Sequence, residues 1–288
     1  MRPFKIYEVS AREGFQQQAA RPTAQVVALI KKIYAAGIRH VEGGSLVNPK
    51  IIPAMANTAE VLTACQALPA MPDLQLSVLI PRPTLFKQAA DLGVAQVAVA
   101  ISREEKFQEK NFHQTIAQAL AGLKQVYQMR EQYAPAIKIK VYLMMAWINE
   151  RPLVQDVALL QAIAPLADEV CLADTAAKAT TATLREHLKC AQEIISLPKL
   201  GLHLHGPAAA VLELGKVALQ AGVVNFDTAL GGGGGCPFID QAQANADTYA
   251  FCQMLQAYFP AAKPPIDLAA LASAASLLAP VKSPTALQ

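Results

Sequence analysis

The sequence predicts a (β/α)8 barrel, on the basis of three observations. Short apolar runs of strand length alternate with longer amphipathic stretches along most of the 288 residues. Eight such pairs follow one another, and about 250 residues is the usual size of this barrel. The connections are only a few residues long, as expected for parallel strands joined by right-handed helical crossovers. A doubly wound open sheet remains the alternative, because alternation alone does not show that a sheet closes.

The predicted strands are runs of four to nine residues, most of them apolar and β-branched, that end in polar or glycine-containing turns. The predicted helices have apolar residues at helical spacing, and Gly37, Gly93 and Gly222 follow three of them as stop signals. In chain order, strands are expected at 5–10, 40–44, 75–80, 96–101, 138–146, 169–172, 200–205 and 224–228. The intervening helices are expected at 23–36, 58–68, 84–92, 111–132, 153–167, 181–195, 208–221 and 242–257.

The end of the chain is predicted to be a separate piece. Beyond residue 258 a joint with three prolines leads to a last helix near 267–278. We therefore expect a barrel domain over 1–258 and a helical extension over 259–288. The extension is expected to pack on the barrel or on a neighbouring subunit.

Composition limits the class of protein. The chain is 53% hydrophobic and 16% charged, and its net charge of +3 with no basic run argues against a nucleic-acid partner. The five cysteines form no CxxC pair, which favours reduced thiols and a cytoplasmic location. The beginning of the chain lacks the apolar segment of a signal peptide. The longest mildly apolar run, 268–281, is shorter than the ~20 residues of a membrane span.

A pair of histidines lies on the seventh predicted strand. His203 and His205 share one face, because neighbouring strand side chains point to opposite sides. Two imidazoles side by side on an apolar strand form half of a metal site. By itself the pair fits one buried and one exposed structural histidine equally well.

Other polar residues gather where barrel strands end, which is where barrels have their active sites. Each has a plainer explanation: a solvated loop charge, a helix cap, a surface lysine or an inert thiol. Glu42 is the exception, because an ionised carboxylate in an apolar strand needs a cationic partner. Cys236 follows five glycines, a run that is costly to order and is suited to a hinge. The candidates are Arg12, Glu13, Glu42, Lys50, Asp174, Cys236 and Asn245.

These residues lie in stretches that resemble the 3-hydroxy-3-methylglutaryl-CoA lyase family, from about residue 5 to residue 252. Gly-Gly-Cys-Pro at 234–237, with Asn245 nine residues after the cysteine, is the most specific of them. The other similar stretches are residues 6–14, 41–50, 107–111, 172–175 and 203–205.

The resemblance implies a divalent metal, Mg²⁺ or Mn²⁺, held by Glu13, His203, His205 and Asn245. Oxygen ligands with two imidazoles suit these ions. It also implies that Arg12 steadies a developing enolate and that Cys236 lies on a mobile loop. A homodimer or higher homo-oligomer is expected by analogy.

This sequence departs from the family pattern at several positions. Glu13 stands where the family has Asp, and Gly206 follows the second histidine where the family usually has Asp. Ala176 and Ala177 replace a turn that usually contains glycine, and residues 144–147 lack the usual cysteine.

The expected reaction is cleavage of a carbon–carbon bond in a 3-hydroxy-3-methylglutaryl-CoA-like thioester. The products are acetyl-CoA and a keto acid such as acetoacetate, as in leucine degradation. His203, with Asp174 near, is the expected base, and Glu42 belongs to the catalytic set. Cys236 or water returns the proton, and Lys50 contacts a CoA phosphate. Two alternatives stay open: an aldolase acting without CoA, and a degenerate barrel that serves as a binding or scaffold protein.

Overall fold

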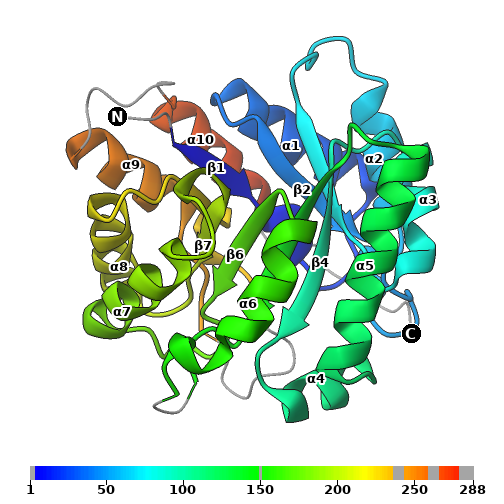
Figure 1. The fold of residues 1–288 in the computed structure, drawn as a ribbon. Helices are drawn as coiled ribbons and strands as arrows, with labels where there is room; N and C mark the ends of the chain where they lie inside the picture. The colour runs from blue at the N-terminus through cyan, green and yellow to red at the C-terminus, as the bar shows by residue number, and fades with distance from the viewer. Residues whose placement is uncertain (1–3, 149–150, 236–242, 259–265, 279–288) are drawn as a thin grey trace, which may run out of the picture.

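The structure is a computed structural model that describes residues 4–148, 151–235, 243–258 and 266–278. Eight parallel strands pair in chain order and close, since β1 pairs with both β2 and β8 (Figure 1). This closure confirms the predicted barrel and excludes the open sheet. The strands are β1 (Lys5–Glu8), β2 (His40–Ser45), β3 (Gln75–Leu79), β4 (Gln96–Ser102), β5 (Lys138–Met144), β6 (Glu169–Ala173), β7 (Leu200–His203) and β8 (Asn225–Thr228).

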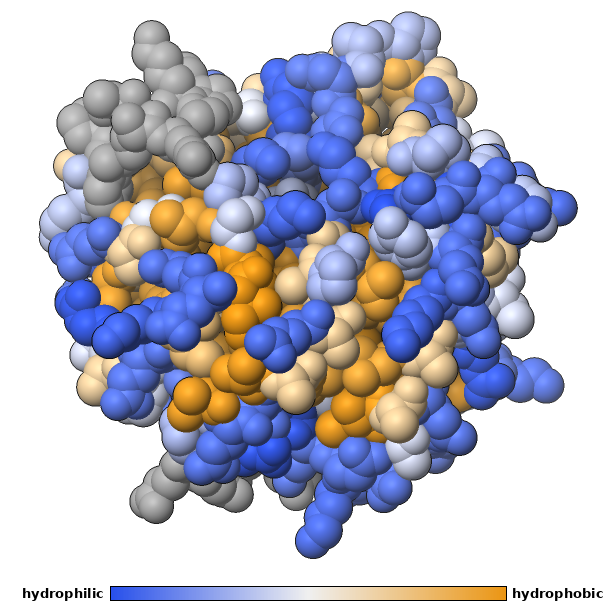
Figure 2. All heavy atoms as spheres, viewed as in Figure 1, coloured by the Kyte–Doolittle hydropathy of each residue, from blue (hydrophilic) through white to orange (hydrophobic). Residues whose placement is uncertain are grey.

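Helices surround the barrel, and each predicted helix has a counterpart in the structure. Polar residues cover much of the outer face of these helices, with apolar residues visible in the spaces between them (Figure 2). The helices are α1 (Thr23–Ala35), α2 (Thr58–Gln66), α3 (Phe86–Asp91), α4 (Glu105–Phe112), α5 (Ile116–Tyr133), α6 (Val157–Ile163), α7 (Thr181–Gln192), α8 (Ala208–Gln220), α9 (Thr248–Tyr258) and α10 (Leu268–Ala275). None of the described helices is long and apolar enough to cross a bilayer.

Local side-chain chemistry explains where helices begin and end. Gly37 ends α1 as predicted, with a φ of 102° that a residue with a side chain rarely adopts. The single helix predicted over 111–132 is wrong at its start. His113 takes a left-handed conformation that ends α4, and a capping box of Thr115 with Gln118 then starts α5.

The predicted helix over 242–257 is also wrong at its start. Helix α9 begins at Thr248, and the preceding Asp247 accepts hydrogen bonds from the amides of Tyr249 and Ala250. Asn245 instead forms an isolated bridge with His205. Its side chain is thereby free of a capping role.

The apolar core lies between the strands and the helices, whereas the barrel interior is partly charged. The ammonium group of Lys140 lies inside the barrel, 3.1 Å from the Glu169 carboxylate and 2.5 Å from that of Asp227. Burial of a charge without such partners would cost several kcal/mol. The interior ion pairs therefore fix the inward direction of these side chains.

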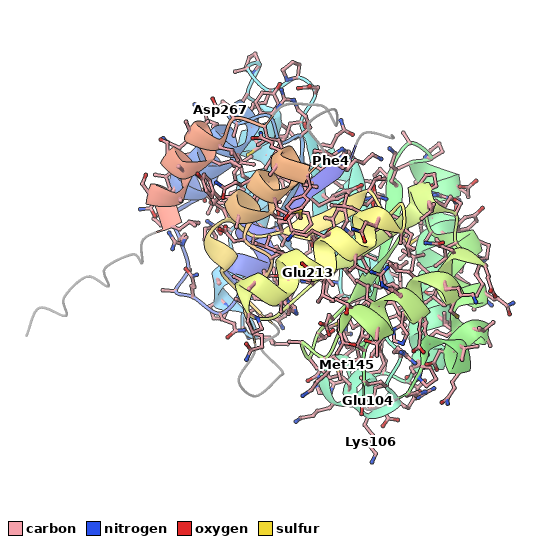
Figure 3. The ribbon with its side chains drawn as sticks, turned by 90° about the vertical axis from the view of Figure 1, so that its left-hand side faces the viewer. Phe4, Glu104, Lys106, Met145, Glu213 and Asp267 are labelled. Carbon is pink, nitrogen blue, oxygen red and sulfur yellow. The ribbon has the colours of Figure 1, made fainter. Side chains whose placement is uncertain are left out.

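The strand ends define two ends of the barrel. Phe4, just before β1, lies at one end of the molecule, and Met145, just after β5, lies at the other (Figure 3). Glu104 and Lys106, which follow β4, lie near Met145. The carboxyl ends of the strands thus share the end where the sequence predicts the functional residues.

Helix α10 packs against α1 and α9, and it also contacts the short turn Leu230–Gly232 after β8. The Arg21 guanidinium donates hydrogen bonds to the carbonyls of Leu277 and Leu278, and Lys32 donates to Ser273. The division of the chain at residue 258 remains a prediction.

We expect Leu271→Ala to lower the free energy of unfolding by about 2–5 kcal/mol, because it empties a fully buried site under α10. Leu268→Ala, on the same helix at a half-buried position, should cost clearly less. Urea unfolding of both variants measures this. Equal, small losses would show that α10 is not part of the cooperative unit of the barrel.

Candidate metal centre and active site

The first candidate residues lie on an unusual turn after β1. Residues Ser10–Gly14 form one turn of π-helix, closed by the hydrogen bond from the Gly14 amide to the Val9 carbonyl. The carboxylate of Glu8 accepts from the Ser10 amide at 2.9 Å and holds the start of this turn. The turn is buried throughout and carries Arg12 and Glu13 toward the barrel axis. The strand predicted over 5–10 is therefore shorter in the structure, where it covers Lys5–Glu8 and is followed by this turn.

The histidine pair is held by one hydrogen bond on each ring. His203 ends β7, and its Nδ1 lies 3.1 Å from a carboxylate oxygen of Asp227. His205 lies beyond the strand, and its Nδ1 is 3.1 Å from the backbone carbonyl of Asp174. Because both partners are acceptors, both rings carry their proton on Nδ1 and direct the lone pair of Nε2 the other way.

Those two lone pairs face each other. The Nε2 atoms of His203 and His205 are 3.1 Å apart, and Asn245 Oδ1 is 3.0 Å from His205 Nε2. Glu13 Oε1 is 3.9 Å from the same nitrogen. The Asn245 amide donates to the Gly233 carbonyl, which turns its oxygen toward the histidines. Four lone-pair donors converging in a buried space repel one another unless a cation lies between them.

The chemistry of this donor set fits a divalent cation. The ligand atoms of Glu13, His203 and His205 lie within 4.8 Å of one another, and all three residues are buried. Burial, followed by the charge of His203, lowers the pKa of His205 to about 3, so its ring is neutral and able to ligate. The structure therefore brings together the four residues for which the sequence predicts a metal site, although one carboxylate is longer than the family pattern.

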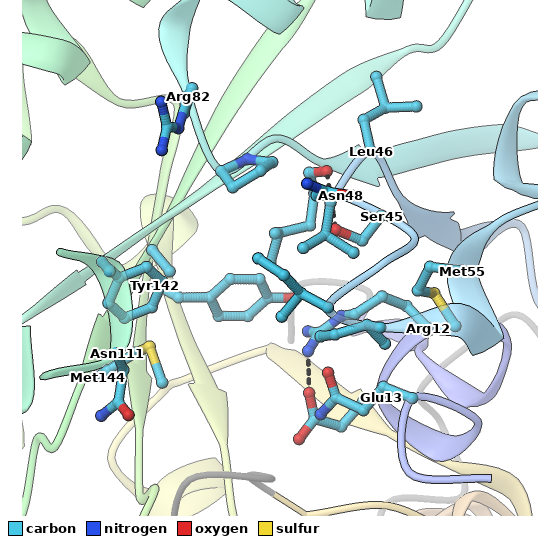
Figure 4. A pocket seen from close by; sticks show the side chains of 18 of the residues that line it. Arg12, Glu13, Ser45, Leu46, Asn48, Met55, Arg82, Asn111, Tyr142 and Met144 are labelled. Atoms are coloured by element: carbon cyan, nitrogen blue, oxygen red, sulfur yellow. Dashed lines mark hydrogen bonds and ion pairs between the residues drawn. The ribbon is translucent and has the colours of Figure 1, made fainter.

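A second cluster lies beside the first. Arg12 donates from Nε and Nη2 to the two oxygens of Glu42, at 3.0 and 3.3 Å, and from Nη1 to Glu13. The phenol of Tyr142 donates to Glu42 at 2.7 Å. Figure 4 shows Tyr142 reaching from β5 toward Arg12, with Glu13 next to the guanidinium. The expectation that buried Glu42 needs a cationic partner is met by Arg12.

Both clusters open into one pocket of about 510 Å³ at the carboxyl ends of the strands. Arg12, Glu13, His203 and His205 line its inner part. Apolar side chains between β2 and α2 line one wall, with more apolar residues across from it. The apolar lining comprises Leu46, Val47, Ile51, Ile52, Met55, Leu85, Phe112 and Met144.

The other predicted residues lie around this centre. Asp174 is fully buried and accepts hydrogen bonds from the amides of Lys178 and Ala179. Desolvation by burial raises the pKa of its carboxyl to about 6. Lys50 is exposed on the loop after β2 and is not among the residues that line the pocket. Cys236 lies outside the described residues.

The described part of the glycine run packs closely against the π-helical turn. A Cβ atom at Gly234 would lie 2.4 Å from the Glu13 carbonyl, and its φ is +96°. The Gly235 carbonyl accepts from the side chains of Gln16 and Gln17. The close approach of the glycine run to the backbone of Glu13 therefore explains why residue 234 is glycine. This reason is independent of the hinge role predicted from the sequence.

Sequence reasoning missed Asp227 and Tyr142. Asp227 fixes the His203 ring, and Tyr142 contacts Glu42. Both are polar residues inside predicted strands. Each lies two positions from another residue that points into the barrel, so the alternation of side chains along a strand could have identified them. Both lie within strands, before the strand ends at which barrel active sites are expected.

Comparison with known proteins agrees with this geometry. Residues 3–278 match the family model described as HMGL-like. The hydroxymethylglutaryl-CoA lyase of Pseudomonas mevalonii is 29% identical over 260 residues, covering 86% of this chain and 83% of that protein. The mitochondrial enzyme of Arabidopsis thaliana is 28% identical over 87% of this chain, which spans only 54% of that relative.

A solved structure is similar throughout. The HMG-CoA lyase of Acinetobacter baumannii, in complex with coenzyme A and 3-methylmalate, has a TM-score of 0.86 and 26% identity. The match covers 96% of this chain and 92% of that one.

The closed barrel and the pocket at the carboxyl ends of its strands have the architecture of a barrel enzyme, and the relatives indicate the carbon–carbon lyase class. The chain belongs to the HMGL-like family, and its relatives make it a hydroxymethylglutaryl-CoA lyase-like enzyme.

We expect Asp227→Asn to weaken Mn²⁺ binding by about 10- to 100-fold, because an amide can donate to His203 Nδ1 and move the ring proton onto Nε2. Glu169→Gln is the matched control, since Glu169 also pairs with Lys140 but its carboxylate makes no contact with the histidines. Calorimetric titration of both variants measures the affinities. Similar losses in the two would assign the effect to the interior ion pairs.

Proposed function

We propose that this chain cleaves a 3-hydroxy-3-methylglutaryl-CoA-like thioester into acetyl-CoA and a keto acid such as acetoacetate. The observation that supports this most strongly is the convergence of Glu13, His203, His205 and Asn245 beside a buried, fixed arginine in one pocket. The complex of the A. baumannii relative with coenzyme A supports a CoA thioester as the substrate.

The proposed metal is Mg²⁺ or Mn²⁺, held by Glu13, His203, His205 and Asn245. When bound, it would lower the pKa of the substrate hydroxyl and help to orient the bond that breaks. The protein contributes rigid ligands: Asp227 and the Asp174 carbonyl fix the two rings, and Gly233 fixes the amide.

The reaction is balanced without an oxidant or reductant. The hydroxyl loses its proton, the bond between C2 and C3 breaks, and C3 becomes the ketone carbon. The electron pair of that bond passes into the thioester enolate, whose carbon then takes up a proton. Arg12 supplies positive charge to the enolate oxygen, where negative charge grows.

The hydrogen bond at one ring nitrogen of His203 indicates which atom could accept the substrate proton. His203 Nδ1 is engaged by Asp227, so Nε2 is the atom of His203 that can accept the hydroxyl proton. The same atom is the ligand donor, so His203 serves one of these roles at a time. Buried Asp174 lies behind the histidines as a further proton-accepting group, and Cys236 or water returns the proton to carbon.

The apolar wall of the pocket supports a substrate with an apolar part. Leu46, Ile52 and Met55 line one side of the cavity that Arg12 and the histidines also line. An alkyl branch on C3 or the pantetheine arm would bury apolar surface there at about 25 cal/mol per Å². Exposed Lys50 is proposed to contact a CoA phosphate.

The decisive assay uses purified protein with Mg²⁺ or Mn²⁺ and a panel of 3-hydroxy-3-alkylglutaryl thioesters and free acids. We expect acetyl-CoA release from thioesters only. Cleavage of the free hydroxy acids would instead indicate an aldolase that acts without CoA. A scaffold protein would cleave neither and would have no reason to retain a stoichiometric divalent ion, which elemental analysis measures.

We expect Arg12→Gln to lower kcat by about 10²- to 10³-fold, because the guanidinium faces the site of the developing oxyanion. Arg39→Gln is the matched control: Arg39 also pairs with a carboxylate, Asp73, and stacks on a tyrosine, Tyr34, but on the outer surface. Steady-state kinetics and Mn²⁺ titration of both variants separate turnover from metal binding. Unchanged kcat in Arg12→Gln would contradict the assignment.

A further inference from the structure

Tyr142 is the residue of the pocket that the proposed reaction does not yet use. It is buried on β5, and its hydroxyl donates to Glu42 Oε2 at 2.7 Å. The Arg12 guanidinium carbon lies 5.3 Å from its ring centre, and the His203 ring meets it edge-on at 5.7 Å. Figure 4 shows the ring extending across the pocket toward Arg12. Tyr142 therefore contacts both the arginine cluster and the metal centre.

The hydrogen bond from Tyr142 limits how Glu42 can move. Arg12 engages both carboxylate oxygens of Glu42 in a fork, and such a pair fixes the plane of the guanidinium relative to the carboxylate. Rotation of that carboxylate would turn the guanidinium with it. The phenol occupies a further lone pair of Oε2 and opposes this rotation, so the orientation of Arg12 depends on the Tyr142 hydroxyl through Glu42.

The phenol is suited to act as a permanent donor. Desolvation by burial, followed by the charges of Asp227 and Glu42, raises the pKa of Tyr142 well above its ordinary value, so the hydroxyl keeps its proton. Lys140 lies 4.9 Å from the ring centre and faces Asp227 and Glu169. The groups around the phenol thus leave Glu42 as the acceptor to which it donates.

We propose that Tyr142 is a positioning residue whose phenol fixes Glu42 and, through it, the guanidinium of Arg12 in the pocket. The expected effect on kcat rests on the proposed function, whereas the fixed orientation of Glu42 and Arg12 does not. The hydrogen bond sets an angle between reactive groups, and small misplacements of such groups cost rate more than binding.

The barrel interior contains a matched control residue. Tyr7 is also a buried phenol, burial and then the charge of nearby Glu169 raise its pKa, and the Lys140 ammonium lies 4.0 Å from its ring centre. It is not among the residues that line the pocket. Tyr7→Phe therefore removes a buried hydroxyl near a carboxylate of the same interior, at a residue that does not line the pocket.

The kinetic test compares Tyr142→Phe with Tyr7→Phe. We expect kcat to fall by about 10- to 100-fold in Tyr142→Phe, the range for losing a hydrogen bond to a charged group. KM and the Kd for Mn²⁺ should stay within about 2-fold of the wild type. In Tyr7→Phe, kcat should also stay within about 2-fold, whatever its effect on unfolding. Equal losses of kcat in the two variants, or a loss confined to KM, would overturn the proposal.

A double-mutant cycle shows whether Tyr142 acts through Glu42. The variant Tyr142→Phe/Glu42→Gln should be no slower than Glu42→Gln alone, because the same carboxylate carries both effects. Additive losses would overturn the proposal, since they would mean that Tyr142 acts independently of Glu42.

Crystal structures separate a failure of this inference from a failure of the proposed function. Lack of thioester cleavage by the wild type would refute the function but would leave the geometric claim to be decided. A crystal structure of Tyr142→Phe in which Glu42 and Arg12 have rotated relative to the wild type supports the claim. Superimposable Glu42 and Arg12 side chains would refute it, whether or not the protein is active.

Discussion

The convergence of four lone-pair donors on one buried point organises the carboxyl end of this barrel. Glu13, His203, His205 and Asn245 come from a turn after β1, from β7 and the residues after it, and from the segment before α9. Nothing in their own chemistry draws them together, because two imidazole lone pairs 3.1 Å apart repel each other. Their arrangement is imposed by the surrounding hydrogen bonds, and a cation shared among them would relieve the repulsion.

A chain of buried charge beneath the pocket supplies part of that constraint. Lys140 bridges Glu169 and Asp227, and Asp227 in turn binds His203. Removing one member would leave its partners charged and unpaired in a medium of low dielectric constant, which is strongly unfavourable. Burial would raise the pKa of Asp227, but Lys140 and His203 together lower it well below its ordinary value, so the carboxylate stays ionised. The interior of the barrel therefore orients a ligand as well as filling space.

Glu8 performs a similar task on the opposite side of the site. It accepts hydrogen bonds from Ser10, from the Leu230 amide and from Thr248. These residues begin the turn that carries Glu13, the glycine run and helix α9, so one carboxylate joins three segments that are distant in the chain. Burial raises the pKa of Glu8, while its four hydrogen bonds oppose that rise. Close packing at Gly234 completes the junction, since a larger residue would push the glycine run away from Glu13.

Eight alternating apolar and amphipathic segments with short connections predicted a barrel, because such segments have few other ways to pack, but the pairing of β1 with β8 was needed to exclude an open sheet. From the residues themselves, His203 and His205 on one face of a strand indicate half of a metal site, whereas Glu13 and Asn245 were expected as ligands through the family resemblance. Only the tertiary structure decided that Arg12 pairs with Glu42, that Asp227 sets the proton position on His203, and that Tyr142 completes the arginine cluster. These contacts join residues 24 to 100 positions apart, and strand register and closure, which no local pattern encodes, bring them within hydrogen-bonding distance.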